Sequence, residues 1–264
     1  MKAVGSCSLL GARYYRSEGI VLRSFPTGEG GLVVVLLQSD GAKLRTMAWG
    51  ARRLTSKKTG HLEPLTRVEA SFSRGRGMDN LTQVQSIEAF SNIKEDLDAT
   101  ARALYFVELV DGFSVEGSSN PSLYKLFLSA LRGLVNVHDL DTAVVHFQWH
   151  LLRICGFMPE LYLCVECQKT IIPDNHRFSV DLGGVLCPQC GSIQSPSICL
   201  SLPALKVLRY LHRTSTLTPL PLKLSEPLKR QLTSILDNSV RHWLDREVRS
   251  KRFMDEVGSA LAEV

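Results

Sequence analysis

The 264-residue chain is 44% hydrophobic and 22% charged, a composition that fits a folded globular protein and excludes a disordered or collagen-like one. Its longest apolar run, Leu32 to Gln38, is far shorter than the roughly 20 residues of a membrane-spanning helix. The N-terminal "MKAVGSCSLLGARYY" lacks the apolar stretch of a signal peptide, so we expect residence in the cytoplasm. The net charge of +5 is unevenly placed, because residues 1–90 hold thirteen lysines and arginines against seven acids.

The first ninety residues contain five runs of strand length, each β-branched or alternating: 18–25, 31–38, 42–50, 66–73 and 80–90. Asp40-Gly41 and the stretch 74–80 supply hairpin turns, and imperfect alternation in the last run leaves room for a bulge. Five short antiparallel strands with one long connection are typical of a small OB-type β-barrel, although an SH3-like barrel would be hard to distinguish. We therefore expect a β-barrel domain over residues 1–90.

The long connection after the third run is strongly basic. The twelve residues "WGARRLTSKKTG", 49–60, hold four cations and no acid, and residues 43–76 hold nine cations against Glu63 and Glu69. A local positive field of this kind attracts nucleic acid or an anionic membrane surface, whereas a merely solvated face gives the same pattern.

Strict alternation in the third run places Lys43, Arg45 and Met47 on the same face as Trp49. Trp49 is then either a stacking platform for bases or a plug at one end of the barrel, since a bulge would exchange the two faces. Cations spread along a strand and a loop favour binding to phosphates without reading of the bases. The candidate DNA-binding residues are Lys43, Arg45, Trp49, Arg52, Arg53, Lys57, Lys58, Arg74 and Arg76.

From Ile93 onward the periodicity becomes helical, in the segments 93–113, 120–134, 141–156, 201–214 and 225–257. Asn120 and Ser225 stand at N-cap positions, and Gly156 is a plausible C-cap. We expect a helical domain over residues 91–264, interrupted by a cysteine-rich module at about 160–195. The fold class predicted for the whole chain is α+β, an OB-type barrel followed by a helical bundle that carries this module.

Two C-x2-C pairs, Cys164 with Cys167 and Cys187 with Cys190, lie at the interval of a four-cysteine zinc site. Four protein thiolates leave no open coordination position, so such a site is structural rather than catalytic. The intervening "FSVDLGGVL" has the glycine turn of a zinc-ribbon hairpin. The alternatives are free thiols or two disulfides, and disulfides are rare in proteins that are not secreted. Cys155 lies in an apolar helix and is expected to be a small core residue.

No sequence motif indicates an enzyme. His146 and His150 have the spacing of a metalloprotease helix, but Phe147 occupies the position of the required glutamate, so we interpret both as surface or core-edge histidines. A phosphate-binding loop, a dinucleotide fingerprint and a nucleophile elbow are all missing from the sequence. We expect a binding protein.

The order of these parts and several local phrases resemble the RecO family of bacterial DNA repair proteins. The resemblance is carried by "EGIVLRSFPTGEGGLVVVLL", "AWGARRLTSKKTGHLEPL", "ALYFVELVDGF", "LLRICGFMPELYLCVEC", "GGVLCPQC" and "REVRSKRFM". It covers nearly the whole chain and is weakest beyond Cys190. All four cysteines are kept, so the resemblance favours one structural Zn²⁺.

This resemblance implies a recombination mediator that binds single- and double-stranded DNA and anneals complementary strands. The implied partners are RecR, in many bacteria RecF, and the single-stranded DNA-binding protein, with RecA placed on gapped DNA as the outcome. By family analogy the helical domain receives the acidic, hydrophobic-ended tail of the single-stranded DNA-binding protein. Candidate contacts for that tail are Lys206, Arg209 and Arg213, on a helix that also offers Leu205 and Leu208.

Two other functions have partial support in the sequence. A zinc-ribbon factor of transcription or RNA metabolism would use the cysteine module as its nucleic-acid face, but residues 164–190 hold only two cations against three acids. A metal-dependent nuclease would need clustered carboxylates, which the sequence does not show.

Overall fold

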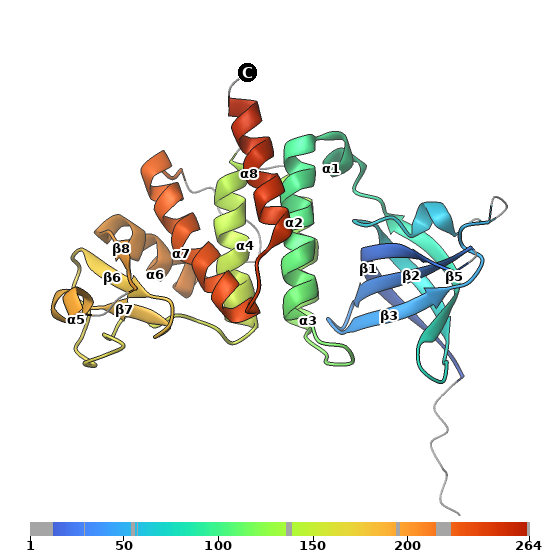
Figure 1. Cartoon of the computed structure of the whole chain (residues 1–264), viewed down its shortest axis with the longest axis horizontal. Coiled ribbons are helices and arrows are strands. Elements are labelled where there is room, and N and C mark those ends of the chain that lie inside the picture. The colour runs from blue at the N-terminus through green and yellow to red at the C-terminus, as the bar shows by residue number, and fades with distance from the viewer. Residues whose placement is uncertain are drawn as a thin grey trace, which may run out of the picture.

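The computed structural model describes residues 13–28, 30–53, 56, 58–135, 139–193, 196–214 and 223–262. A β-barrel, a helical bundle and a small module with a three-stranded sheet lie in a row, and the module is inserted in the chain between helices of the bundle (Figure 1). Among the described residues no helix has the length and hydropathy needed to cross a membrane.

The barrel has five strands: β1 (Tyr14–Thr27), β2 (Gly31–Gln38), β3 (Lys43–Ala48), β4 (Arg67–Ser73) and β5 (Asp79–Glu88). They close in the order β1-β2-β3-β5-β4, with β3 and β5 parallel and every other pair antiparallel. A short helix, η1 (Thr59–His61), lies in the long connection between β3 and β4. This is the topology of an OB barrel, which confirms that prediction. Irregular register in the β4–β5 pair accounts for the imperfect alternation of the fifth run.

The two faces of β1 and β2 belong to two different cores. Val21, Val34 and Leu36 point into the barrel and pack with its interior residues. Ile20 and Leu22, on either side of Val21, point to the outer face, where they join the large core of the helices. Leu37 and Val35 of β2 do the same. The barrel therefore shares its outer apolar surface with the helical bundle.

Ion pairs reinforce this junction. Asp111 of the bundle pairs with Arg23 of β1 at 2.9 Å and with Lys43 of β3 at 3.4 Å. Arg67 on β4 binds Glu18 on β1 at 2.8 Å, and this hydrogen bond holds the pKa of Glu18 below its ordinary value. Tyr124 of the bundle donates to the same Glu18 carboxylate. Charged contacts thus surround the apolar seam between the two parts.

The helices are α1 (Ser91–Glu95), α2 (Leu97–Phe113), α3 (Pro121–Leu134), α4 (Leu140–Ile154), α6 (Leu202–Arg213), α7 (Glu226–Leu244) and α8 (Arg249–Ala262). Two segments expected to be continuous are divided. Asp96 accepts from the backbone N–H groups of Asp98 and Ala99 and so begins a new helix at Leu97. Asp245, in the left-handed region at φ 50°, ends α7 and allows α8 to turn back against α2.

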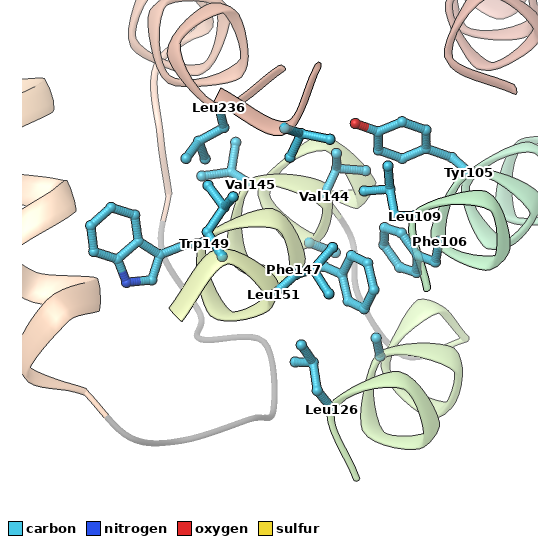
Figure 2. Close-up of a cluster of buried hydrophobic side chains, with 14 of the residues drawn as sticks. Tyr105, Phe106, Leu109, Leu126, Val144, Val145, Phe147, Trp149, Leu151 and Leu236 are labelled. Atoms are coloured by element: carbon cyan, nitrogen blue, oxygen red, sulfur yellow. The ribbon is translucent and has the colours of Figure 1, made fainter. Parts of the chain in front are cut away.

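Helix α4 is the centre of the bundle, packed against α3 and α7 (Figure 2). Phe147 stacks on Phe106 of α2 with ring centroids 4.0 Å apart, while Trp149 points to the opposite side of the helix. Because α4 is surrounded, His146 and His150 are both buried, so their interpretation as surface or core-edge residues was wrong. Burial lowers the pKa of His150 to about 3.

The cysteine module contains β6 (His176–Ser179), β7 (Gly184–Leu186), α5 (Pro188–Ile193) and β8 (Ile198–Leu200), with the sheet order β7-β6-β8. The hairpin expected between the two cysteine pairs is present, because Ser179 pairs with Gly184. Gly183 supplies the positive φ of 70° that the turn requires.

Candidate nucleic-acid interface and metal centre

The outer face of β3 carries the predicted alternation. Thr46 and Ala48 are buried, whereas Arg45 lies exposed on the other face. Trp49 continues that outer face, is 64% exposed and donates its indole N–H to the Asn80 side chain at 2.9 Å. An indole so exposed cannot fill the barrel, which excludes the plug. Trp49 instead presents its ring to solvent beside the cations, the arrangement of a stacking platform.

The segment after Trp49 is fixed to the barrel at several points. Arg52 donates its backbone N–H to the carbonyl of Gly30 in the β1–β2 turn, and its side chain is exposed like that of Arg53. Lys58 donates to the carbonyl of Leu81 at 3.1 Å, and its partial burial lowers its pKa. Lys58 therefore anchors the segment to β5 and is not a free cation. Lys57 lies outside the described residues.

The turn between β4 and β5 brings two more predicted cations to the same end of the barrel. Asp79 organises this turn, since its carboxylate accepts from the Tyr15 hydroxyl at 2.5 Å and from the Gly75 N–H at 3.1 Å. The guanidinium of Arg74 lies 5.7 Å from the centre of the Tyr15 ring. Arg76 is exposed at the tip of the turn. Both cations thus lie on a turn next to Asn80, the hydrogen-bond partner of Trp49.

Lys43 does not belong to this surface. Its ammonium donates to the Asp111 carbonyl at 2.7 Å and pairs with the Asp111 carboxylate, so it is occupied at the junction with the helices. The alternation of β3 correctly predicted its face. The outer face of β3 is exposed to solvent at Arg45, however, and is covered by the helices at Lys43.

Three exposed residues at the start of β1 extend the surface and were not predicted from the sequence: Arg13, Tyr14 and Arg16. Arg13 accepts at its carbonyl from the backbone N–H of Arg74, which joins this segment to the β4–β5 turn. We expected the first strand to begin at residue 18. The adjacent tyrosines in "RYYR", aromatic residues that favour strands, are the signal that indicates an earlier start.

The four cysteines of the two C-x2-C pairs converge. All four Sγ atoms lie within 4.8 Å of one another, and those of Cys167 and Cys187 are 3.8 Å apart. Sulfurs at two corners of a zinc tetrahedron with Zn–S bonds of about 2.3 Å would stand about 3.8 Å apart. The four residues are free thiols, so the disulfide alternative is not adopted. The donor set and spacing fit one thiophilic metal ion with no open position.

Backbone groups favour the thiolate form of Cys164. Burial raises the pKa of the Cys164 thiol, but backbone N–H groups of Cys167, Cys187 and Glu166 outweigh it and bring the pKa to about 6. Both knuckles have the same turn, because Gln168 and Gly191 donate their N–H groups to the carbonyls of Cys164 and Cys187. Gln168 adopts a φ of 60° to do so. Cys155, by contrast, is partly buried against the helical core, and burial raises its pKa to about 11.

The candidate partner surface on α6 is smaller than expected. Arg209 donates to the carbonyls of Leu161 and Ile171 and covers the Tyr162 ring at 4.8 Å, so it ties the cysteine module to α6. Leu205 and Leu208 are completely buried in the core and are not offered to a partner. The exposed face of α6 consists instead of Lys206, Tyr210 and Arg213 together with Pro203.

The fold and the site define a class of protein: an OB barrel with an exposed basic and aromatic end, fused to a helical bundle and a four-cysteine module. Family models agree with this division. "Recombination protein O N terminal" matches residues 13–90, and "Recombination protein O C terminal" matches residues 94–252.

Curated relatives extend over nearly the whole chain. DNA repair protein RecO of Desulforudis audaxviator is 36% identical and covers 93% of this chain and 98% of its own length. RecO of Roseiflexus sp. is 33% identical over 94% of this chain and 88% of its own. RecO of a Dehalococcoides mccartyi strain is 32% identical over 93% and 97%. The chain belongs to the RecO family of DNA repair proteins.

Proposed function

We propose that this chain is a mediator of recombinational DNA repair that binds single- and double-stranded DNA without sequence specificity and anneals complementary strands. With RecR, and with RecF where it is present, it would promote loading of RecA onto DNA coated by the single-stranded DNA-binding protein. The observation that carries the proposal is the exposed indole of Trp49, with the exposed side chains of Arg45, Arg52 and Arg53 close to it in the sequence.

The physical basis is charge neutralisation. Cations on the barrel reduce the repulsion between two phosphate backbones, and their salt-dependent contacts allow the strands to slide relative to each other. Base pairing then supplies the sequence specificity. No bond is made or broken, so we propose a binding protein rather than an enzyme, acting in the cytoplasm in association with the nucleoid.

We propose that the four-cysteine cluster holds one structural Zn²⁺. The metal would fix the two knuckles and hence the orientation of the module against α6. Metal analysis of the purified chain is expected to give one zinc per molecule, and Cys164→Ser with Cys187→Ser is expected to remove it. A preparation that is folded and free of metal would contradict this assignment.

For the acidic, hydrophobic-ended tail of the single-stranded DNA-binding protein, we retain α6 as the candidate site in a revised form. Lys206 and Arg213 would pair with the acidic residues, and Tyr210 replaces Leu205 and Leu208 as the apolar contact, because it is the exposed side chain between them. Arg209 supports this surface from inside the protein.

Annealing of two complementary labelled oligonucleotides tests the main proposal. We expect the protein to accelerate duplex formation without ATP. Shortening of the strands would instead indicate a nuclease. Failure to accelerate would leave the zinc-ribbon factor, with the cysteine module as its nucleic-acid face.

The double variant Arg52→Glu with Arg53→Glu should weaken DNA binding. It should also lower the dependence of single-strand binding on salt, by about 0.7 in logarithmic slope for each phosphate that the protein no longer neutralises. The matched control is Lys125→Glu with Arg230→Glu, which makes the same change in net charge at two exposed positions of the helices. Equal effects of the two double variants would mean that net charge, and not the segment 49–58, determines binding.

A further inference from the structure

The strand register aligns side chains from all five barrel strands in one row. Phe25 pairs with Val33, Val33 with Met47, Met47 with Asn80, Asn80 with Ser73, and Ser73 with Tyr14. Residues paired across neighbouring strands point to the same face of a sheet, here the outer face. We call these six residues the cross-strand row: Phe25, Val33, Met47, Asn80, Ser73 and Tyr14. The row begins and ends on β1, so it passes around the barrel.

Exposed aromatic rings stand at both ends of this row and near its middle. Tyr14 is 61% exposed and Phe25 is 37% exposed, and Trp49 is attached to the row through its hydrogen bond to Asn80. The guanidinium of Arg13 lies 5.8 Å from the centre of the Tyr14 ring, and that of Arg45 lies 5.7 Å from the centre of the Phe25 ring. Each terminal ring thus has a cation beside it, as a platform for a nucleotide requires.

The rest of the outer surface favours this row as a track. Ile20, Leu22, Val35 and Leu37 are covered by the helical core, and Lys43 is occupied by Asp111. Along the row itself, the two oxygens of the nearby Asp79 carboxylate accept hydrogen bonds from the Tyr15 hydroxyl and the Gly75 N–H, so this side chain is held in the β4–β5 turn.

The dimensions fit a short single strand. Five steps between neighbouring strands at about 4.8 Å give a path of about 24 Å between Phe25 and Tyr14. Stacked bases at about 3.4 Å per step would cover that path with about seven nucleotides, within the range known for OB folds. Duplex DNA has a persistence length of about 150 base pairs and cannot follow a curve around a barrel of this size.

We propose that the cross-strand row is a binding track for one unpaired strand of nucleic acid, with bases stacked on Phe25, Trp49 and Tyr14 and with phosphates near Arg45, Arg13 and Arg74. The proposal rests on the proposed function, since it specifies how the barrel holds DNA. The exposed cations of the 49–53 segment remain available to a second strand. Annealing would then require the bound strand to leave its stacking platforms base by base as it pairs.

Binding of a fluorescently labelled oligo-dT of twelve nucleotides to the full-length protein tests the track. We expect Tyr14→Ala, Phe25→Ala and Trp49→Ala each to raise the Kd by about 5- to 150-fold, the effect of losing one stacked base. Because no charge is removed, the salt slope should stay that of the wild type. Tyr14→Phe should retain the affinity. Phe253→Ala is the control, since Phe253 is also a half-exposed aromatic residue, on α8 away from the barrel.

The outcomes separate the two proposals. Loss of affinity in the three barrel variants but not in Phe253→Ala supports the track. Tight binding that is unchanged in Tyr14→Ala and Phe25→Ala overturns the track and leaves general DNA binding intact. Absence of binding by the wild type at low salt overturns both. Thermal unfolding of each variant shows whether the fold is kept. If Tyr14→Ala is unstable, Tyr14→Leu, which removes the ring but keeps an apolar side chain, provides the second measurement.

Discussion

Separation of the barrel from the helices should unfold it. A fragment of residues 13–90 exposes the outer side chains of Ile20, Leu22, Val35, Leu37 and Leu65, all of which are buried against the helical core in the full chain. Burial of such a side chain contributes roughly 1.5–3 kcal/mol, so five of them contribute about 8–15 kcal/mol. An ordinary domain has a folding free energy of about 5–15 kcal/mol. The loss is therefore comparable to the total stability.

Circular dichroism and analytical ultracentrifugation of the fragment provide the assay. We expect an aggregated or non-cooperatively unfolding species. A second fragment with Ile20→Thr, Leu22→Gln, Val35→Thr and Leu37→Gln is expected to be more soluble and better folded than the first, because its outer face no longer requires the helices. The same four changes in the full chain should be strongly destabilising. A monomeric, cooperatively melting wild-type fragment would refute the reasoning.

Two further predictions concern single sites. At Gly41, where φ is 80°, an added Cβ would lie 1.8 Å from the Asn120 carbonyl oxygen. Gly41→Ala should therefore lower the free energy of unfolding, measured in urea, by more than about 2 kcal/mol. The control Gly77→Ala should be nearly neutral, because its added Cβ would meet no atom within 4 Å. Because the folded pKa of His150 is about 3, only the unfolded state gains its proton as the pH falls below about 6.5. Stability should then decrease by about 1.4 kcal/mol per pH unit towards pH 4, and less steeply in His150→Gln; equal slopes would contradict this.

The sequence predicted those features that depend on local pattern. Alternation placed Arg45 and Trp49 on the outer face of β3, and the two C-x2-C pairs located the cluster of thiols. Asn120 caps α3 as expected, by accepting from the Leu123 N–H. Each of these features is determined by residues close together in the chain or by a spacing with only one plausible geometry.

The features that were missed depend on distant partners. Lys43 and Arg209 look like solvated cations in the sequence, and only the fold brings Asp111 to the first and the carbonyl of Leu161 to the second. The backbone turn at Asp245 was hidden because helical periodicity continues on both sides of it. Burial of His150 follows from the central place of α4, which periodicity alone does not reveal.

The seam between the barrel and the bundle has a consequence for assembly. Asp111 pairs with Arg23 and Lys43 beside a shared apolar contact, so the barrel and the helices are joined by a packed interface and not by a bare linker. A protein bound to the exposed face of α6 would then be held at a constant distance and orientation from a DNA strand bound to the barrel. This arrangement would raise the effective concentration of the bound protein at the bound strand through a fixed geometry, and not through the length of a flexible linker.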